Sequence, residues 1–160
     1  MGFPVVFNLE LELEFRSIKL VLENYSKQNL SDFFIFHYRR GDKVAKDCKD
    51  SVLNKRINCK PMKEFISLIK NITDNNAKIY IATNEEEPNQ LDVLNKSDVF
   101  SFLTLKSGGI HLNSYRLMLF ELQLLVSAKR SYFVKGSSTL ESFVIDARFQ
   151  RSYTPPIFYV

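Results

Sequence analysis

Short apolar runs alternate with longer amphipathic segments four times along this chain. Four runs rich in aromatic and β-branched residues predict buried strands: FFIFHY at 33–38, KIYIAT at 78–83, VFSFL at 99–103 and SYFVK at 131–135. The segments between these runs are long enough to cross over the sheet as helices. This alternation predicts an α/β fold, with an open, mainly parallel sheet and helices on both faces.

The helices are predicted from apolar positions that recur every three or four residues. For the first helix an alternative remains, because LELELEF at 9–15 also alternates in the manner of a strand. Residues 39–60 are predicted to form a polar loop. The predicted helices span residues 9–27, 61–72, 88–94, 115–127 and 138–148.

Length and charge narrow the range of functions. A chain of 160 residues is expected to form a single domain over 1–160. Its net charge of +4 is modest and its basic residues are scattered, which makes nucleic-acid binding the weakest of the functional classes. The apolar runs are too short to span a membrane, and the first ten residues do not have the pattern of a signal peptide. We therefore expect no membrane contact from this chain itself.

Two cysteines and four asparagines bear on the compartment in which the protein matures. Cys48 and Cys59 flank a polar loop, and they either form a disulfide or remain two free thiols. A zinc site is not expected, because no other cysteine or histidine cluster accompanies them. Asn-x-Ser/Thr tripeptides begin at Asn24, Asn29, Asn71 and Asn95. Each tripeptide is weak evidence of secretion when taken alone.

Three chemically rich stretches directly follow three of the predicted strands. They are HYRRGDK at 37–43, TNEEE at 83–87 and KGSST at 135–139. Parallel strands end at the same edge of a sheet, and ligands of open α/β folds bind beyond that edge. We therefore expect these stretches to surround one binding site.

The stretch HYRRGDK offers basic groups to an anionic ligand. Alternation along the strand places His37 and Arg39 on the same side, and the planar guanidinium of an arginine matches a phosphate well. Arg40, Asp42 and Lys43 are expected to orient this arginine or to add charge. The alternative is a solvated strand end whose exposed ion pairs contribute little.

A second anion-compatible feature is predicted after the fourth strand. Ser138 and Glu141 have the spacing of a capping box, and Gly136 permits close approach of a ligand to the backbone. An ordinary capped helix is the alternative. The sequence has no GxGxxG, no GxxxxGK[ST], no GxSxG and no Asp-x-Asp pair. A nucleotide diphosphate would therefore be neutralised by basic side chains and backbone amides.

HYRRGDKV resembles the His-x-Arg-Arg-x-Asp motif of the GDP-fucose-dependent fucosyltransferases, and it is most similar to the α1,6-fucosyltransferases. The likeness continues in the same order through PMKEFI, KIYIATNEEEP and FELQLLVSAKRSYFVKGSSTLESFVIDAR, and covers roughly residues 9–148. It implies the Rossmann-like half of a two-lobed, GT-B-like glycosyltransferase that inverts and needs no metal. The chain is then expected to be a donor-binding and catalytic domain, a fragment without the N-terminal acceptor lobe.

The resemblance also implies roles for individual residues. Arg39 would grip the β-phosphate of the donor, and Asp47 would stand where an acidic residue is proposed as the general base. Asn84 and Glu85 stand where these enzymes have an Asp-Asp pair, and Glu121 stands where an aspartate reads guanine. The expected catalytic residues are Arg39, Lys43 and Asp47, and the expected donor-binding residues are His37, Arg39, Arg40, Asp42, Asn84, Glu85, Glu121, Ser137 and Ser138.

The function implied by the resemblance is transfer of fucose from GDP-fucose to a glycan, of the N-glycan core type, or to a protein. The expected partners are a nucleotide-sugar donor and a glycan or glycoprotein acceptor, with no nucleic acid, no metal and no cofactor. The expected location is the secretory pathway, in the Golgi or the lumen of the endoplasmic reticulum. The alternative is a non-catalytic module that retains the fold and binds a nucleotide sugar or a glycan.

Overall fold

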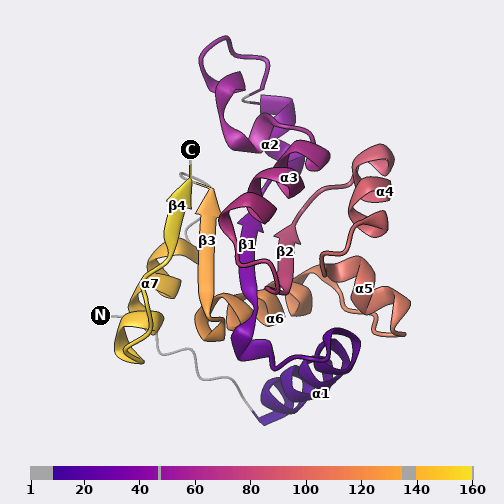
Figure 1. The fold of residues 1–160 in the computed structure, drawn as a ribbon, viewed down its shortest axis with the longest axis vertical. Helices are drawn as coiled ribbons and strands as arrows, with labels where there is room; N and C mark the ends of the chain where they lie inside the picture. The colour runs from indigo at the N-terminus through magenta and orange to yellow at the C-terminus, as the bar shows by residue number, and fades with distance from the viewer. Residues whose placement is uncertain (1–8, 47, 135–139, 160) are drawn as a thin grey trace.

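At the centre of the molecule is a sheet of four parallel strands in the order β2-β1-β3-β4 (Figure 1). The computed structural model describes residues 9–46, 48–134 and 140–159, without the side chains of Lys43, Ala45, Phe158 and Tyr159. The strands are β1 (Phe34–Tyr38), β2 (Ile79–Thr83), β3 (Arg130–Val134) and β4 (Ile157–Tyr159). The prediction of an α/β fold with an open parallel sheet is confirmed.

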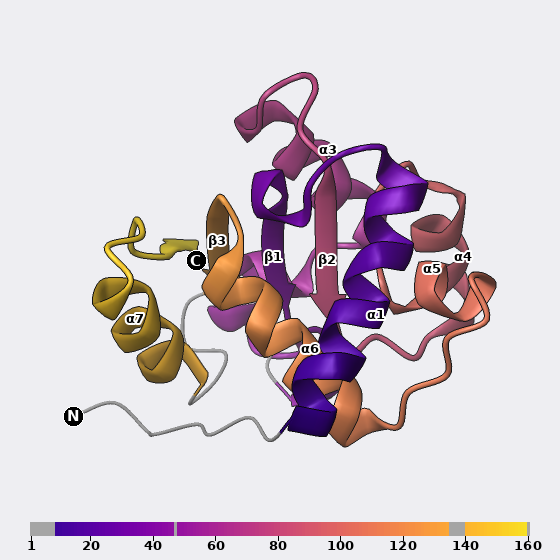
Figure 2. The same cartoon turned by 90° about the horizontal axis from the view of Figure 1, so that it is seen from below.

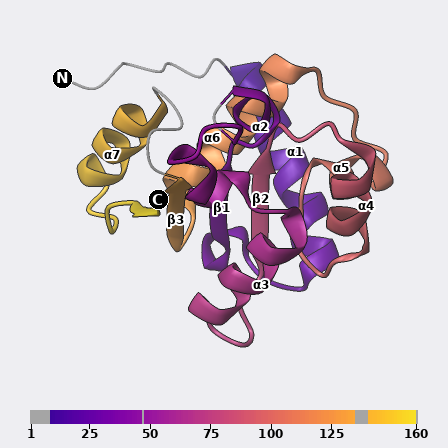
Figure 3. The same cartoon turned by 90° about the horizontal axis from the view of Figure 1, so that it is seen from above.

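Helices cover both faces of the sheet, as the view onto the strand ends shows (Figure 3). One face carries α1 (Leu9–Ser26), α6 (Ser114–Ser127) and α7 (Leu140–Gln150), and the other carries α3 (Met62–Ile72). The remaining helices are α2 (Gly41–Lys46) after β1, and α4 (Pro88–Lys96) and α5 (Phe102–Ser107) beyond β2, with single 3-10 turns at Leu30–Asp32, Leu53–Lys55 and Ile57–Cys59. In the described parts of the chain, no helix is both long and apolar enough to cross a membrane.

Alternate residues of the strands pack into two separate cores. Ile35 and Phe133 point to the side of α1 and α6 and are buried there. Phe36 points to the opposite side, where its ring stacks on Tyr132 with centroids 4.2 Å apart and meets the edge of Phe65 of α3. Burial on both faces explains why the strand sequences are apolar throughout instead of alternating with polar residues.

The first helix and the third predicted strand show how local patterns compete. LELELEF forms the first turns of α1, because Ile18 and Leu22 on the same helix are buried against the sheet. The prediction of a strand at 99–103 is wrong except at Phe100, which makes an isolated parallel bridge to Tyr80. Helix α5 begins directly afterwards, because Ser101 and Thr104 form a capping box that starts it. Strand β4 and helix α2 were not predicted.

The strand order determines where a ligand is expected. The chain enters the sheet in the middle at β1, adds β2 and the Phe100 bridge on one side, and then adds β3 and β4 on the other. This is the order of doubly wound sheets. In such sheets the crevice for a ligand lies at the carboxyl ends of the strands, near the point where the order reverses, which here is between β1 and β3.

A disulfide closes the segment that stands above the carboxyl ends of the strands (Figure 1). Cys48 and Cys59 are joined, with Cα atoms 5.4 Å apart, so the alternative of two free thiols does not hold in this structure. The segment contains the turns Leu53–Lys55 and Ile57–Cys59 where a loop was predicted. A link across a loop of this length stabilises the folded chain by about 3 kcal/mol.

Arg148 of α7 is the largest fully buried side chain, with 1% of its surface exposed. Its guanidinium donates to the main-chain oxygens of Leu125 (3.0 Å), Ala128 (2.8 Å) and Thr154 (2.6 Å). The first two of these carbonyls belong to the end of α6 and the residue after it. A cation at this place also opposes the negative end of the helix dipole. Arg148 therefore holds α7 against the carboxyl end of α6, on the same face of the sheet.

We predict that Arg148→Met lowers the free energy of unfolding by about 3 kcal/mol, because several buried carbonyl oxygens lose their donor at once. Urea unfolding of the purified chain measures this loss. Arg151→Met, at an exposed position three residues further along, is the matched control and is expected to stay close to the parent. Equal stability of the two variants would contradict the structural role of Arg148.

Candidate functional site

A cavity of about 570 Å³ opens at the carboxyl ends of β1 and β2 and extends between α5 and α6. Its volume lies within the range of small-molecule and cofactor sites. One part is polar and is lined by His37, Arg39, Thr83, Asn84, Glu85 and Glu86. The other part is mainly apolar and is lined by Phe102, Leu105, Ile110, Leu112, Leu117, Leu122 and Leu125. The cavity therefore fits a ligand with an ionic end and a flat or apolar end.

Arg39, the first residue after β1, is held in place by a two-pronged contact with Asp42. Its Nε donates to Oδ1 at 2.9 Å and a terminal nitrogen donates to Oδ2 at 2.6 Å. The bond from Arg39 lowers the pKa of Asp42 below its usual range, and a bond from Asn84 adds to the effect. The pair lies three residues apart on a turn that enters α2, and 40% of the arginine side chain remains exposed. Arg39 thus reaches the cavity with its orientation restrained.

Asn84, directly after β2, joins the carboxyl ends of the neighbouring strands β1 and β2. Its Oδ1 accepts the backbone N–H groups of Arg40 (2.9 Å) and Gly41 (3.0 Å), and its Nδ2 donates to Asp42 at 3.1 Å. Gly41 is needed for this approach, because a Cβ there would lie 2.6 Å from the Asn84 carbonyl oxygen. Asn84 therefore positions the backbone of the loop and the carboxylate that holds Arg39.

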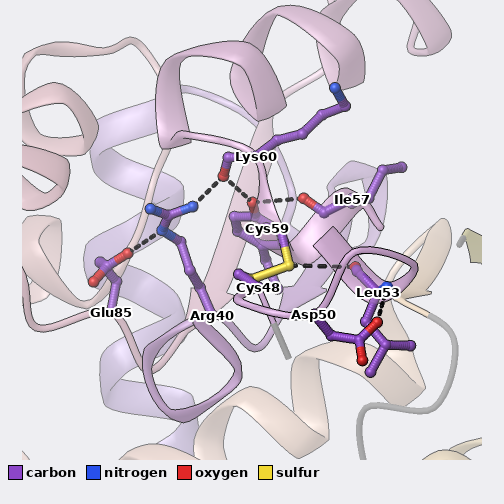
Figure 4. Close-up of a disulfide and its surroundings, with 9 residues drawn as sticks. Arg40, Cys48, Asp50, Leu53, Ile57, Cys59, Lys60 and Glu85 are labelled. Atoms are coloured by element: carbon purple, nitrogen blue, oxygen red, sulfur yellow. Dashed lines mark hydrogen bonds and ion pairs between the residues drawn. A yellow bond between two sulfur atoms is a disulfide. The ribbon is translucent and has the colours of Figure 1, made fainter. Parts of the chain in front are cut away.

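Arg40 forms a buried ion pair with Glu85 (Figure 4). Both side chains are about 5% exposed, and the guanidinium also donates to the carbonyl oxygen of Lys60. Glu85 in turn accepts the backbone N–H groups of Glu86 and Glu87, each at 3.0 Å. Arg40 was expected among the donor-binding residues, but it is not among those that line the cavity. Arg40 instead joins the loops that carry the site, through Glu85 and the Lys60 carbonyl, and these contacts are called the framework below.

The disulfide segment is fastened to the same framework. Tyr38, the last residue of β1, donates its hydroxyl to the carbonyl oxygens of Ile57 (3.0 Å) and Lys60 (2.7 Å). Figure 4 shows Arg40 between Glu85 and the Lys60 carbonyl, next to the disulfide. Burial raises the pKa of Tyr38 to about 12, so its hydroxyl remains a donor at physiological pH. The loop from Cys48 to Lys60 is consequently anchored to the strand ends that carry the site.

His37 lies at the sheet end of the cavity with its ring 5.1 Å from that of Phe133. Burial lowers its pKa to about 4, and the nearby charge of Arg39 contributes in the same direction. The imidazole is therefore neutral at pH 7, with one nitrogen as a donor and the other as an acceptor. It is equipped to orient a polar group of a ligand but not to supply a positive charge.

Glu121 of α6 lies on the cavity wall opposite the sheet and accepts the Tyr80 hydroxyl at 3.0 Å. Burial among apolar neighbours raises its pKa to about 8, although the bond from Tyr80 acts in the opposite direction. Tyr80 itself is fully buried on β2, and its pKa is raised well above the usual value, first by desolvation and then by Glu121. Glu121 is thus mainly a neutral acid at pH 7, able to donate as well as accept.

Two helices begin at the cavity. Ser114, the first residue of α6, and Leu140, the first residue of α7, both line it. The start of α6 is capped by Asn113, whose Oδ1 accepts the backbone N–H of Arg116 at 2.8 Å. The positive ends of two helix dipoles therefore face the same cavity, and they favour a ligand with negative charge.

The structure brings five of the predicted site residues together and leaves others outside its description. His37, Arg39, Asn84, Glu85 and Glu121 all line the cavity. Asp42 does not line it but holds Arg39, and Arg40 lies beneath it. Asp47, Ser137, Ser138 and the side chain of Lys43 lie outside the described residues. Their predicted roles stay predictions.

Sequence reasoning missed several lining residues. Phe102 and Lys106 line the cavity and Tyr80 supports Glu121, although none of the three was predicted there. Thr83 also lines the cavity, within the TNEEE stretch that was predicted to border the site. Alternation along β2 places Tyr80 on the same side as Ala82, which lines the cavity, and that signal was present in the sequence. Phe102 and Lys106 were hidden because residues 99–103 were assigned to a strand. The capping-box spacing of Ser101 and Thr104 was the signal for the helix that carries them.

Neither the protein-family models nor the curated proteins contain a match to this chain.

We predict that the parent becomes less stable as the pH rises, because Glu121 titrates, and that the Glu121→Gln variant lacks this loss of stability. Between about pH 5 and pH 8 the unfolded parent releases the Glu121 proton while the folded parent keeps it, so unfolding becomes easier. Glutamine does not titrate. Denaturant unfolding at both pH values should show the parent losing about 2–4 kcal/mol relative to the variant. A difference that stays constant with pH would contradict the raised pKa of Glu121, and Glu86→Gln at the exposed rim is the control.

Proposed function

We propose that this chain is the donor-binding and catalytic domain of a GDP-fucose-dependent fucosyltransferase. The observation that carries the proposal is the position of Arg39, at the carboxyl end of the central strand and at the polar end of a 570 Å³ cavity. The residues around it occur in the order of the His-x-Arg-Arg-x-Asp motif. In that motif the first arginine is the one implied to grip the donor phosphate.

The chemistry of the proposed reaction needs a group of this kind. Transfer breaks the bond between C1 of fucose and the β-phosphate oxygen, and the bonding electrons stay on the departing diphosphate. A guanidinium fixed before the reaction stabilises that developing charge without reorganising. Asp42 and Asn84 supply the restraint, so they act as positioning residues and Arg39 as the catalytic one.

The roles proposed for the acceptor hydroxyl and for the base that takes its proton come from the resemblance. The acceptor hydroxyl attacks C1 from the opposite side, which inverts the configuration, and it releases its proton to a carboxylate. Asp47 is the proposed base. In the sequence it directly precedes Cys48, whose disulfide closes the segment that Tyr38 and Arg40 fasten at Lys60.

The remaining wall of the cavity fits the nucleoside part of the donor. Apolar side chains from α5 and α6 would cover the faces of a flat base, and Glu121 would meet its polar edge. Two N–H groups on one edge of guanine match the two oxygens of an ionised carboxylate, so binding of the base would draw Glu121 from its neutral form to its charged form. Glu121 is one methylene longer than the aspartate implied by the resemblance, and its contact with Tyr80 determines how far it reaches.

The proposal also includes a second lobe with which this domain would assemble and the cell compartment in which it would mature. The domain would be the Rossmann-like half of a two-lobed, GT-B-like enzyme, with the acceptor bound between the lobes. A disulfide is typical of oxidising compartments, and the Cys48–Cys59 link supports maturation in the secretory pathway. The alternative, a non-catalytic module that binds the nucleotide sugar, uses the same cavity and differs only in the absence of transfer.

We predict that Arg39→Lys weakens the binding of GDP by about ten- to a hundredfold, because lysine keeps the charge but loses the planar pair of donors. Calorimetric titration of the purified chain with GDP measures the change. The matched control is Arg151→Lys, since Arg151 is exposed and not among the residues that line the cavity. Arg40→Lys is unsuitable as a control because it disturbs a buried ion pair. A variant that binds GDP as the parent does would contradict the arginine clamp.

The function itself is tested with GDP-fucose and a glycopeptide acceptor that carries an N-glycan core. We expect saturable binding of GDP in preference to ADP and UDP, unchanged by a chelator, and acceptor-dependent release of GDP. Mass spectrometry of the acceptor should show the added fucose. Selective GDP binding without transfer would agree both with the binding module and with a catalytic domain that needs its acceptor lobe, and transfer by this chain would exclude the binding module. Failure to bind GDP at all would overturn both forms of the proposal.

A further inference from the structure

We infer that the edge of the sheet opposite the cavity is a glycosylated surface, with N-linked glycans on Asn29 and Asn71 above all. This inference concerns a different part of the molecule and does not depend on the identity of the ligand. It begins from the four Asn-x-Ser/Thr tripeptides, which the proposed function leaves unused. What the structure adds is their location and their exposure.

The tripeptides all lie where a helix returns to the start of a strand. Asn24 is in the last turn of α1, and Asn29 lies between that helix and β1. Asn71 is in the last turn of α3, which precedes β2, and Asn95 is in the last turn of α4, which precedes the Phe100 bridge. The chain enters the sheet at all of these points. They therefore lie at the amino-terminal edge, the side from which Figure 2 is drawn.

Contacts between the connections confirm that they form one surface. Gln28 donates its side-chain amide to the carbonyl oxygen of Asn76 at 3.2 Å, which joins the α1–β1 and α3–β2 connections. Lys70 forms an ion pair with Asp98, which joins the end of α3 to the connection after α4. Segments 24–29, 70–78 and 95–98 thus lie beside one another although they are far apart in the sequence.

Comparison with the other asparagines of the chain shows that the tripeptides are concentrated at the amino-terminal edge of the sheet. The chain has twelve asparagines, and the five near the carboxyl-terminal edge do not begin such a tripeptide: Asn54, Asn58, Asn84, Asn89 and Asn113. Among the described residues of the amino-terminal edge, Asn75 and Asn76 lack the pattern, and Asn8 lies outside the described residues. A chance distribution of serine and threonine gives no reason for this difference. A requirement that bulky glycans stay away from the cavity accounts for it.

All four asparagines of the tripeptides are exposed, as a carrier of a large polar group must be. Asn29 lies outside the regular helices in an extended conformation, with φ −67° and ψ 140°, and Ser31 is exposed as well. Asn71 is followed by Thr73, the only threonine among the four tripeptides. These features single out Asn29 and Asn71 as the primary acceptors.

The modification also needs the right compartment and a sugar donor. The Cys48–Cys59 disulfide is independent evidence for an oxidising compartment, where N-glycosylation takes place. The side-chain amide nitrogen attacks the anomeric carbon of an oligosaccharide carried on a lipid pyrophosphate. A carbon–nitrogen bond forms, the carbon–oxygen bond to the pyrophosphate breaks, and the amide loses one proton to a base of the transferring enzyme. The lipid pyrophosphate leaves with the bonding electrons.

The test is the intact mass of the full chain after it has been directed into the secretory pathway of a eukaryotic cell by an appended, cleavable signal sequence. We expect at least two glycans, and we expect enzymatic release of the glycans to convert Asn29 and Asn71 to aspartate. Asn29→Gln and Ser31→Ala should each remove the same single glycan, because either change destroys the tripeptide. Asn75→Gln, at the same edge but outside a tripeptide, should remove none.

Secreted, disulfide-bonded chain with both asparagines unmodified would overturn the inference, as would glycans confined to other positions. Neither result involves GDP or GDP-fucose. The outcome therefore stands apart from the outcome for the proposed function.

Discussion

The buried ion pair between Arg40 and Glu85 is the contact on which the arrangement of the carboxyl-terminal edge depends. It joins the residues that follow β1 and β2, and through the Lys60 carbonyl it also holds the end of the disulfide segment. A buried pair of this kind contributes little net stability, but removal of one partner leaves an uncompensated charge at a cost of about 3–5 kcal/mol. It therefore fixes the position of the loops more than it stabilises the fold. Residues of the two loops that this pair joins line the polar part of the cavity, so the pair helps to determine the shape of the cavity.

The pair also explains why a buried strand ends in six charged or titratable residues within seven positions. The residues of HYRRGDK are divided between two tasks. Arg40 turns inward and forms the framework, whereas Arg39 turns toward the cavity with Asp42 as its support. A solvated strand end would leave all of these groups in water, and the burial of Arg40 to 5% exposure excludes that alternative for this residue.

The strands and helices that were predicted correctly are those whose apolar pattern lies within one continuous stretch of the sequence. β1, β2, β3 and the five longer helices follow from runs and periodicities that lie within a few residues of one another. The failures have nonlocal causes. VFSFL has the composition of a strand, yet only Phe100 finds a neighbouring strand, and the capping of α5 by Ser101 prevails. Strand β4 is three residues long at the sheet edge, directly after Pro155 and Pro156, so its pattern is too short to detect.

The same distinction applies to the candidate site. Alternation along β1 was enough to place His37 and Arg39 together, because both belong to one strand. The partnership of Arg40 with Glu85 and that of Asn84 with Asp42 each join residues more than forty positions apart. The burial of Arg148 depends on carbonyls of another helix. No local pattern in the sequence encodes such contacts.

The parallel sheet gives the molecule two edges with opposite electrostatic character, independently of any resemblance. Helices α6 and α7 begin at the cavity, and their positive dipole ends add to the charge of Arg39. Helices α1, α3 and α4 end at the other edge, where carbonyl groups and ion pairs such as Lys70–Asp98 meet the solvent. An anionic ligand is therefore favoured at the carboxyl-terminal edge and disfavoured at the amino-terminal one. The amino-terminal edge is left to neutral, bulky groups that need only exposure, which is the property that its asparagines share.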